Sequence, residues 1–461
     1  MQNPQFLCIF VCLKRLKMRI RVFLTLTILS TFILRTFGLD FQGPDVRVVT
    51  FTPASTTGLE EVYVVNSASG AVVSYPSASA RWSRFSNLGG GYAESVAATV
   101  SGNTSSITLG PEDMGYIVED EGRQHCFWIV NYANHYLNLQ SLTAAAEQEC
   151  GRITFDLNGD ASEIPYYTAT GRRMTLSREL KLSWNTLEYD EENFSYNPVA
   201  AEETLDHAAH TFSAPAPLQS TEYILAGDRF LRAWGMEESV TSPMIPAMAV
   251  EAQTRATQSV RENDNEQKND VSGLGGSAPC EIAFEAIVSD AAIYHRWELA
   301  RDPEFGILEN SYSELDFDYT FTENGNYYVR LVANNAEGTC EFTGTTYEIT
   351  IGESKLLIPN AFSPQSSPGV NDEWKVSYKS LIEYECHIFN RLGTCIFTSK
   401  DPAKGWDGKY RGKFVPAGVY YYVIKARGAD GVDYKRAGDI NIINYSGPTG
   451  TTPEGDSSTE E

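Results

Sequence analysis

The chain has 461 residues and a formal net charge of −24, from 36 Lys and Arg against 60 Asp and Glu. Its length exceeds what a single hydrophobic core organises, so we expect three or four domains. The negative charge repels phosphate backbones and disfavours nucleic acid as a partner. The 25 Tyr and 22 Phe, beside 36 Gly and 20 Pro, favour short strands joined by turns over long helices.

Residues 1–38 have the pattern of a Sec signal peptide. Basic residues between positions 14 and 21 precede an apolar run from Val22 to Leu34, which is too short to cross a bilayer as a helix. We therefore expect export, with translation starting at Met1 or Met18 and no transmembrane segment after cleavage of the signal. A buried N-terminal helix is the alternative.

Six cysteines follow the predicted signal peptide. An even number of cysteines in an exported chain predicts disulfides, and six of them allow fifteen pairings. No Cys-x-x-Cys motif occurs, which disfavours a zinc site and thioredoxin-like chemistry. The disulfide candidates are Cys126, Cys150, Cys280, Cys340, Cys386 and Cys395.

Short strands with alternating apolar residues begin at Val46 and recur at intervals of about ten residues. This spacing is typical of a β-sandwich, and Trp82 lies where a core Trp would. A strand that begins at Cys150 starts the pattern again. We therefore predict two immunoglobulin-like (Ig-like) β modules, at residues 39–147 and 148–250.

The composition changes at residues 251–276, where polar residues and Gly dominate and no aromatic residue occurs. Such a segment buries little apolar surface, so we expect a flexible linker. A short exposed helix from Val250 to Val260 is the alternative.

A third module is expected at residues 277–353. Arg296–Leu299 has the character of a mid-sandwich strand with its Trp in the core, and residues 319–335 form a turn and an aromatic-led strand that ends in Asn-Asn. These segments resemble a PKD-type Ig-like domain. Cys280 and Cys340 lie at its two ends and are the predicted disulfide, worth about 4 kcal/mol in the chain-entropy model.

Several short motifs follow one another between Leu357 and Ile443. They comprise a proline-bounded entry segment, an Asn-Asp pair, a turn flanked by cysteines, a Trp-Asp-Gly turn and the Pro-Ala-Gly start of an apolar strand. Their residues are Pro359, Asn360, Phe362, Pro364, Asn371, Asp372, Asn390, Arg391, Gly393, Trp406, Asp407, Gly408, Pro416, Gly418 and Tyr420.

Each motif has a structural explanation. Gly393 is free to take a positive φ in its turn, and Asp407 can accept backbone hydrogen bonds in an Asx-turn without any catalytic role. Residues 419–424 are apolar on both faces, as expected of a central strand. Cys386 and Cys395 flank the turn at Gly393, either as a cross-strand disulfide or as two buried thiols.

Together these motifs resemble the gliding motility-associated (type B) C-terminal sorting domain of Bacteroidetes type IX secretion cargo. The resemblance covers residues 354–446 and implies a β-sandwich that the type IX machinery recognises, with export across the outer membrane to the cell surface or beyond. It also implies removal of the domain outside the cell, with release or attachment to surface lipopolysaccharide. The loop at residues 365–369 lacks the family's first acid, which leaves a poor cation site. Residues 447–461 are predicted to be a disordered acidic tail.

No catalytic, cofactor or metal motif is found. His207 and His210 form the only close His pair and lack a third ligand, so exposed loop histidines are the better interpretation. Acidic clusters at residues 189–193 and 202–203 would serve glycoside hydrolysis only if a cleft held two carboxylates at a defined separation; solvated loops are the alternative.

The sequence therefore predicts an all-β chain of about three tandem Ig-like β-sandwich modules and a C-terminal β-sandwich sorting domain. We expect a modular protein at the cell surface or secreted, whose Ig-like modules bind a glycan or protein ligand or form a stalk. A secreted hydrolase with a site in the first two modules, and a purely structural spacer, are the alternatives.

Overall fold

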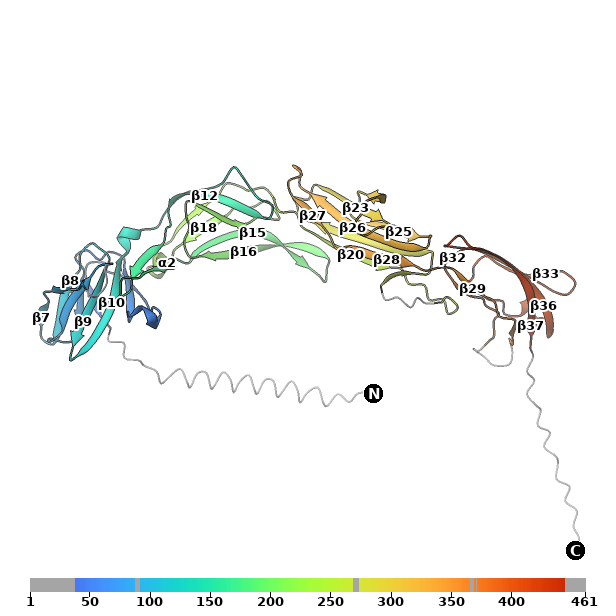
Figure 1. Cartoon of the computed structure of the whole chain (residues 1–461), viewed down its shortest axis with the longest axis horizontal. Coiled ribbons are helices and arrows are strands. Elements are labelled where there is room, and N and C mark those ends of the chain that lie inside the picture. The colour runs from blue at the N-terminus through green and yellow to red at the C-terminus, as the bar shows by residue number, and fades with distance from the viewer. Residues whose placement is uncertain (1–37, 88–91, 268–272, 365–368, 370, 444–461) are drawn as a thin grey trace, which may run out of the picture.

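The computed structural model describes residues 38–87, 92–267, 273–364, 369 and 371–443. The predicted signal peptide, most of the altered loop at residues 365–369 and the predicted tail lie outside these residues. Four β-domains follow one another along an extended arch (Figure 1). The short helix α2 (Arg229–Ala233) and a few 3-10 turns interrupt the strands. The all-β prediction is confirmed.

The first domain packs a four-stranded sheet (β1-β4-β8-β7) on a six-stranded sheet (β2-β3-β10-β9-β5-β6). Its strands are β1 (Asp40–Gln42), β2 (Val48–Phe51), β3 (Glu61–Val65), β4 (Val72–Tyr75), β5 (Arg81–Phe85), β6 (Glu94–Val96), β7 (Thr99–Ser101), β8 (Thr104–Thr108), β9 (Met114–Asp120) and β10 (Arg123–Asn131). Trp82 is buried between the two sheets, as predicted, and its indole N–H donates to the Ser105 hydroxyl at 3.0 Å.

The second domain comprises sheets β11-β12-β17, β13-β14 and β16-β15-β18-β19. Its strands are β11 (Asn138–Ala144), β12 (Arg152–Asp160), β13 (Ile164–Tyr167), β14 (Arg173–Leu176), β15 (Leu180–Asp190), β16 (Ser195–Leu205), β17 (Thr211–Pro215), β18 (Ile224–Gly227) and β19 (Glu238–Thr241). Since β11 pairs with β12, the second domain begins before the predicted boundary at residue 148.

The third domain packs sheet β20-β22-β25 on sheet β21-β28-β26-β23-β24, with β27 paired to β26. Its strands are β20 (Ala252–Gln258), β21 (Leu274–Gly276), β22 (Cys280–Val288), β23 (Tyr294–Ala300), β24 (Leu308–Tyr312), β25 (Phe317–Phe321), β26 (Gly325–Asn334), β27 (Glu341–Thr343) and β28 (Tyr347–Ile351). Trp297, the predicted core Trp, is fully buried.

Strand β20 corrects the prediction of a flexible linker at residues 251–276 and excludes the alternative helix. It pairs with β22 over its whole length. As an edge strand it turns only small side chains such as Ala252 and Ala256 toward the core. Its other residues are polar, and Arg255 and Thr257 are exposed, so the composition of the strand resembles that of a linker.

The fourth domain contains the five-stranded sheet β30-β37-β36-β32-β33 and two small sheets, β29-β31 and β34-β35. Its strands are β29 (Lys355–Leu357), β30 (Ala361–Phe362), β31 (Ser377–Lys379), β32 (Leu381–Phe389), β33 (Cys395–Ser399), β34 (Lys409–Tyr410), β35 (Lys413–Phe414), β36 (Gly418–Gly428) and β37 (Asp433–Ile442). The predicted central strand is β36, between β32 and β37. One face of it lies in the core, while Val419, Tyr421 and Val423 are exposed on the other.

Candidate functional site

The C-terminal motifs converge on one aromatic cluster in the fourth domain. The Trp406 ring lies 5.4 Å from the Phe362 ring and 5.3 Å from the Tyr420 ring. The indole N–H of Trp374 donates to the Pro359 carbonyl at 2.7 Å, and the backbones of the two tryptophans hydrogen-bond to each other. The entry segment and the Trp-Asp-Gly turn therefore meet in one core, although more than forty residues separate them.

Two of the other motifs form turns. The Asp407 carboxylate accepts from the Lys409 amide at 3.0 Å, which is the predicted Asx-turn, and Gly408 has a φ of 73°. The Asn390 side chain accepts from the amides of Leu392 and Thr394 around Gly393, whose φ is 81°. These contacts give Asp407 and Asn390 a structural role in their turns.

The cysteine pairing differs from the prediction. Cys150 and Cys340 form the disulfide, with their Cα atoms 5.3 Å apart, so the predicted Cys280–Cys340 bond is wrong. Cys280 is buried in β22 with a free thiol. Cys340 lies in the loop before β27, at the end of the third domain that faces the second.

The other cysteines are free. Cys386 is buried opposite Ser399, whereas Cys395 is exposed and stands opposite Phe389, so the register of the β32–β33 hairpin keeps the two apart. Burial raises the pKa of the Cys386 thiol to about 11. Cys126 is a partly buried free thiol on β10.

The residues considered for chemistry lie apart from one another. His207 and His210 are exposed, and the nearest carboxylate oxygen to His207 belongs to Glu163, at 4.0 Å. Asp190 accepts from Asn193 in a hairpin turn. Within the described residues, no group of three His, Cys, Asp or Glu side chains is placed to hold a metal ion.

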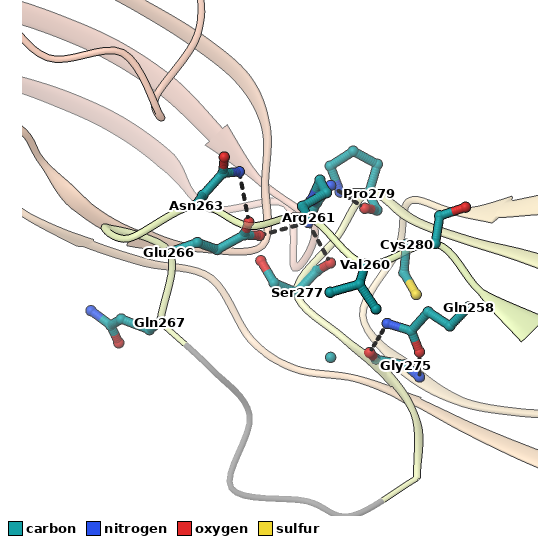
Figure 2. Close-up of a pocket in the computed structure, with 12 residues that line it drawn as sticks. Gln258, Val260, Arg261, Asn263, Glu266, Gln267, Gly275, Ser277, Pro279 and Cys280 are labelled. Atoms are coloured by element: carbon teal, nitrogen blue, oxygen red, sulfur yellow. Dashed lines mark hydrogen bonds and ion pairs between the residues drawn. The ribbon is translucent and has the colours of Figure 1, made fainter. Parts of the chain in front are cut away.

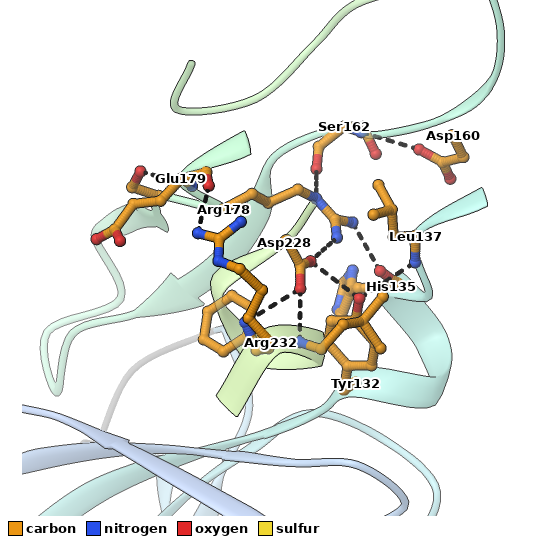
Figure 3. Close-up of polar contacts among 12 residues, drawn as sticks. Tyr132, His135, Leu137, Asp160, Ser162, Arg178, Glu179, Asp228 and Arg232 are labelled. Carbon is orange, nitrogen blue, oxygen red and sulfur yellow. Dashed lines mark hydrogen bonds and ion pairs between the residues drawn. The ribbon is translucent and has the colours of Figure 1, made fainter. Parts of the chain in front are cut away.

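The distinctive contacts of the structure lie at the junctions between domains: a buried ion pair, a disulfide and a hydrogen-bonded arm. At the first junction a buried polar cluster joins the exit of the first domain to the second (Figure 3). Arg178 and Asp228 are both fully buried and pair at 2.7 Å. The Asp228 carboxylate also accepts from the Tyr132 hydroxyl at 2.9 Å and, as the N-cap of α2, from two backbone amides.

The Arg178 guanidinium has a partner on each nitrogen. Its Nε donates to the Ser162 carbonyl and its second terminal nitrogen to the His135 carbonyl, both at 2.6 Å. Burial and the Asp228 carboxylate raise the pKa of Tyr132, so this hydroxyl stays a neutral donor. A buried ion pair is tolerated when further hydrogen bonds compensate the loss of water, and here each guanidinium nitrogen has a partner.

Apolar packing reinforces the first junction. The outer face of the six-stranded sheet, including Val62 and Trp128, belongs to the same core cluster as Ile153 and Leu182 of the second domain. Strand β3 and the second half of β10 are therefore buried on both faces. The first two domains form one packed unit.

The second junction, between the second and third domains, is held by a disulfide and by a separate contact at a hairpin tip. The Cys150–Cys340 disulfide links loops of the second and third domains across 190 residues of sequence. At the tip of the β15–β16 hairpin, the Phe194 ring receives the Arg255 guanidinium at 4.2 Å. A small apolar cluster that includes Val250 and Ala333 lies at the same junction.

The third junction joins the third and fourth domains through a polar arm, which we define as residues 263–267. Part of the mixed-charge run that was predicted to be flexible, this arm hydrogen-bonds along β31. Gln267 N donates to the Tyr378 carbonyl at 2.7 Å, and Tyr378 N donates to the Asn265 carbonyl at 3.1 Å. The Asn265 amide also donates to the carbonyls of Val376 and Pro402, both at 2.8 Å.

A cavity of about 330 Å³ lies at the base of this arm (Figure 2). Arg261 crosses it and donates to the Glu266 carboxylate at 2.5 Å and the Ser277 carbonyl at 3.0 Å. Gln258 exchanges two hydrogen bonds with the backbone of Gly275. These polar groups satisfy one another and hold the arm in place.

Comparisons with known proteins identify two of the domains. Residues 142–242 match the fibronectin type III domain (Fn3_FA), and residues 356–442 match the CHU_C type IX secretion signal domain. Neither is a catalytic kind of domain. None of the curated proteins matches the chain. In the described residues, no helix is long and apolar enough to cross a membrane.

Several solved structures match the chain at low sequence identity. A tetra-tandem repeat from the extending region of a large adhesion protein matches at 11% identity, over 82% of this chain and 96% of that one, with a TM-score of 0.21. Chicken CNTN1 FN1-FN3 domains match at 13% over 66% and 99%, with a TM-score of 0.21. Dimeric latent PorU from Porphyromonas gingivalis matches at 9% over 69% and 35%, with a TM-score of 0.14.

The predicted sorting domain thus coincides with a matched secretion signal domain, and the predicted Ig-like modules with a region that includes a fibronectin type III domain. The chain is a cargo of the type IX secretion system, a modular β-protein that carries its sorting domain at residues 356–442.

Proposed function

We propose that this protein is a stiff stalk on the surface of a Bacteroidetes cell, brought to the periplasm by a Sec signal peptide and across the outer membrane by its type IX sorting domain. The observation that carries the proposal is that all three domain junctions are fixed by buried or covalent contacts. A binding protein with freely jointed modules would not need such junctions. A stalk does, because its length depends on them.

The junctions support the proposal through three different interactions. A fully buried ion pair fastens the first, a disulfide the second and a backbone-paired arm the third. Interfaces between domains of one chain usually permit relative motion unless they are large and apolar or otherwise constrained. Here each of them is constrained.

Export is tested by deletion. In a host with a type IX system, the full chain should reach the cell surface, and a chain lacking Leu357–Glu461 should accumulate in the periplasm. Surface exposure of the truncated chain would contradict the export role.

Stiffness is tested by small-angle X-ray scattering of the purified chain. A stalk gives one narrow distribution of maximum dimension at every salt concentration, whereas jointed modules give a broad one. A glycan array and a screen of the first two domains against polysaccharides and peptides distinguish a stalk from an adhesin or a hydrolase. Binding or turnover there would replace the stalk with one of those functions. Lipopolysaccharide attachment, which the family resemblance implies, would appear as a mass increase in the surface form.

A further inference from the structure

The covalent connection between the third domain and the sorting domain is only three residues long. Strand β28 ends at Ile351 and β29 begins at Lys355. The Gly352 amide donates to the Gly276 carbonyl at 2.9 Å, which ties the start of the connector to β21. Ser354 is 8% exposed.

Ser354 is the fixed point of the connector. Its amide donates to the Asp430 carboxylate at 2.8 Å, and its hydroxyl donates to the same carboxylate at 2.7 Å. The Tyr434 hydroxyl donates to the Ser354 carbonyl at 3.1 Å. Burial opposes ionisation of Asp430, but the hydrogen bonds from Ser354 outweigh it and lower the pKa of the carboxyl. The acceptor is therefore charged at neutral pH.

The chain beyond the connector is also paired. Lys355–Leu357 forms β29 on β31, the Pro359 carbonyl accepts from Trp374, and the Asn360 carbonyl accepts from the Asn441 amide at 2.9 Å. Glu353 is exposed, but it lies between Gly352 and Ser354, which are both anchored, and Ile358 packs against the core of the fourth domain. Proteases cut exposed and flexible segments, so this region offers them no site without local opening.

Local opening is opposed from both sides of the junction. Ala429 of the sorting domain belongs to the core cluster of the third domain, and its carbonyl accepts from the Asn324 amide at 3.1 Å. Across the same interface, the Ser380 hydroxyl accepts from the buried Ala278 amide at 3.2 Å. Freeing the connector would therefore break a shared core as well as the polar arm.

We infer that the sorting domain is retained in the mature protein as its fourth structural domain, because its junction with the third domain shields the connector from proteolysis. Removal, which the family resemblance implies, would require this junction to open first. The inference rests on the proposed export for its setting, but the shielding is a property of the folded chain and is measurable without export.

The first test is limited proteolysis of the purified full chain by subtilisin. The comparison is a variant with ten Gly and Ser residues inserted between Gly352 and Glu353, which supplies an exposed site and leaves both domains intact. We expect cleavage between Gly352 and Asn360 of the natural chain to be at least about 100-fold slower than cleavage in the insertion. Rates within about tenfold of each other, or resistance of the insertion itself, would overturn the inference.

A matched pair of substitutions tests the cause. Asp430→Asn weakens the anchor of Ser354 and should raise the cleavage rate, whereas Asp433→Asn, at the exposed start of β37, should not. Equal rates for both variants would show that Ser354 and Asp430 do not provide the shielding. In cells, the mass of the exported chain should include β37. An exported chain ending between Gly352 and Asn360 would refute retention, while failure to reach the surface would count against export alone and leave the proteolysis result to decide.

Discussion

Replacing Arg178 with Met removes one partner of the buried pair at the first junction and leaves the other charged. Asp228 would keep the Tyr132 hydroxyl and the two amides of α2 as donors but lose the cation paired with it. The carbonyls of Ser162 and His135 would lose their donor as well. Breaking a buried ion pair in this way costs about 3–5 kcal/mol, and the two orphaned carbonyls place this variant toward the upper end.

The loss of stability should be confined to the region around Asp228, because unfolding of a chain with four domains is not a two-state process. Hydrogen exchange of the full chain measures it at β18 and α2, the elements on either side of Asp228. A cost of about 3–5 kcal/mol corresponds to exchange roughly two to four orders of magnitude faster at amides that exchange by opening of this unit. Asp228→Asn should have a similar effect, since it leaves Arg178 charged and unpaired.

Two comparisons make the result decisive. The double variant R178M/D228N buries no unpaired charge. Its loss of local stability should therefore be clearly smaller than the sum of the losses in the two single variants. Arg84→Met breaks an exposed pair with Glu94, whose side chains are 51% and 71% exposed, and should cost less than about 1 kcal/mol. If R178M exchanged no faster at α2 than R84M does at β5, the buried pair would not be what fastens the first junction.

Three further predictions concern the disulfide, the thiols and the sorting-domain core. Substituting Ser for both Cys150 and Cys340 should broaden the distribution of maximum dimension in scattering, because it removes the covalent link and leaves noncovalent contacts at the second junction, such as the hairpin tip and a small apolar cluster. An unchanged distribution would contradict the role of the disulfide. In the native chain at pH 8, iodoacetamide should modify exposed Cys395 first and leave Cys386 nearly unreacted, since Cys386 is buried and burial raises its pKa to about 11. Equal labelling of the two cysteines in mass spectrometry would refute this. Trp406→Ala should destabilise the sorting domain by about 3–5 kcal/mol and lower its melting temperature, because the ring is fully buried; an unchanged melting transition would show that the aromatic cluster does not hold the domain together.

Much of the fold follows from local patterns in the sequence. Alternating strands with a central Trp indicate the first and third sandwiches, and Trp82 and Trp297 lie in the cores where the pattern placed them. The turn at Gly393 and the Asx-turn at Asp407 also follow from residue type alone. These features depend on contacts within a few residues or within one domain, which periodicity and turn chemistry encode.

The junctions could not be predicted in this way, because they depend on contacts between distant parts of the chain. Arg178 stands in a Ser-Arg-Glu sequence that is typical of an exposed turn, and only the tertiary structure buries it. The polar arm has no apolar residues to indicate burial, and its partners in β31 follow more than 100 residues later. Cys340 is nearer to Cys280 than to Cys150 in the sequence. In the folded chain, however, the facing ends of the second and third domains bring Cys150 and Cys340 together.

The disulfide at the second junction also constrains the order in which the chain matures. While the chain emerges from its N-terminus, Cys150 must wait for 190 further residues before its partner exists. In that interval Cys126 and Cys280 are the competing thiols. Cys126 is partly buried on β10, and burial in β22 withdraws Cys280 once the third domain has folded. Correct pairing therefore depends on the third domain folding before oxidation is complete, and the bond then records that the second and third domains have docked. Under the proposed export by the type IX system, a chain with this bond would be exported with its second and third domains already docked.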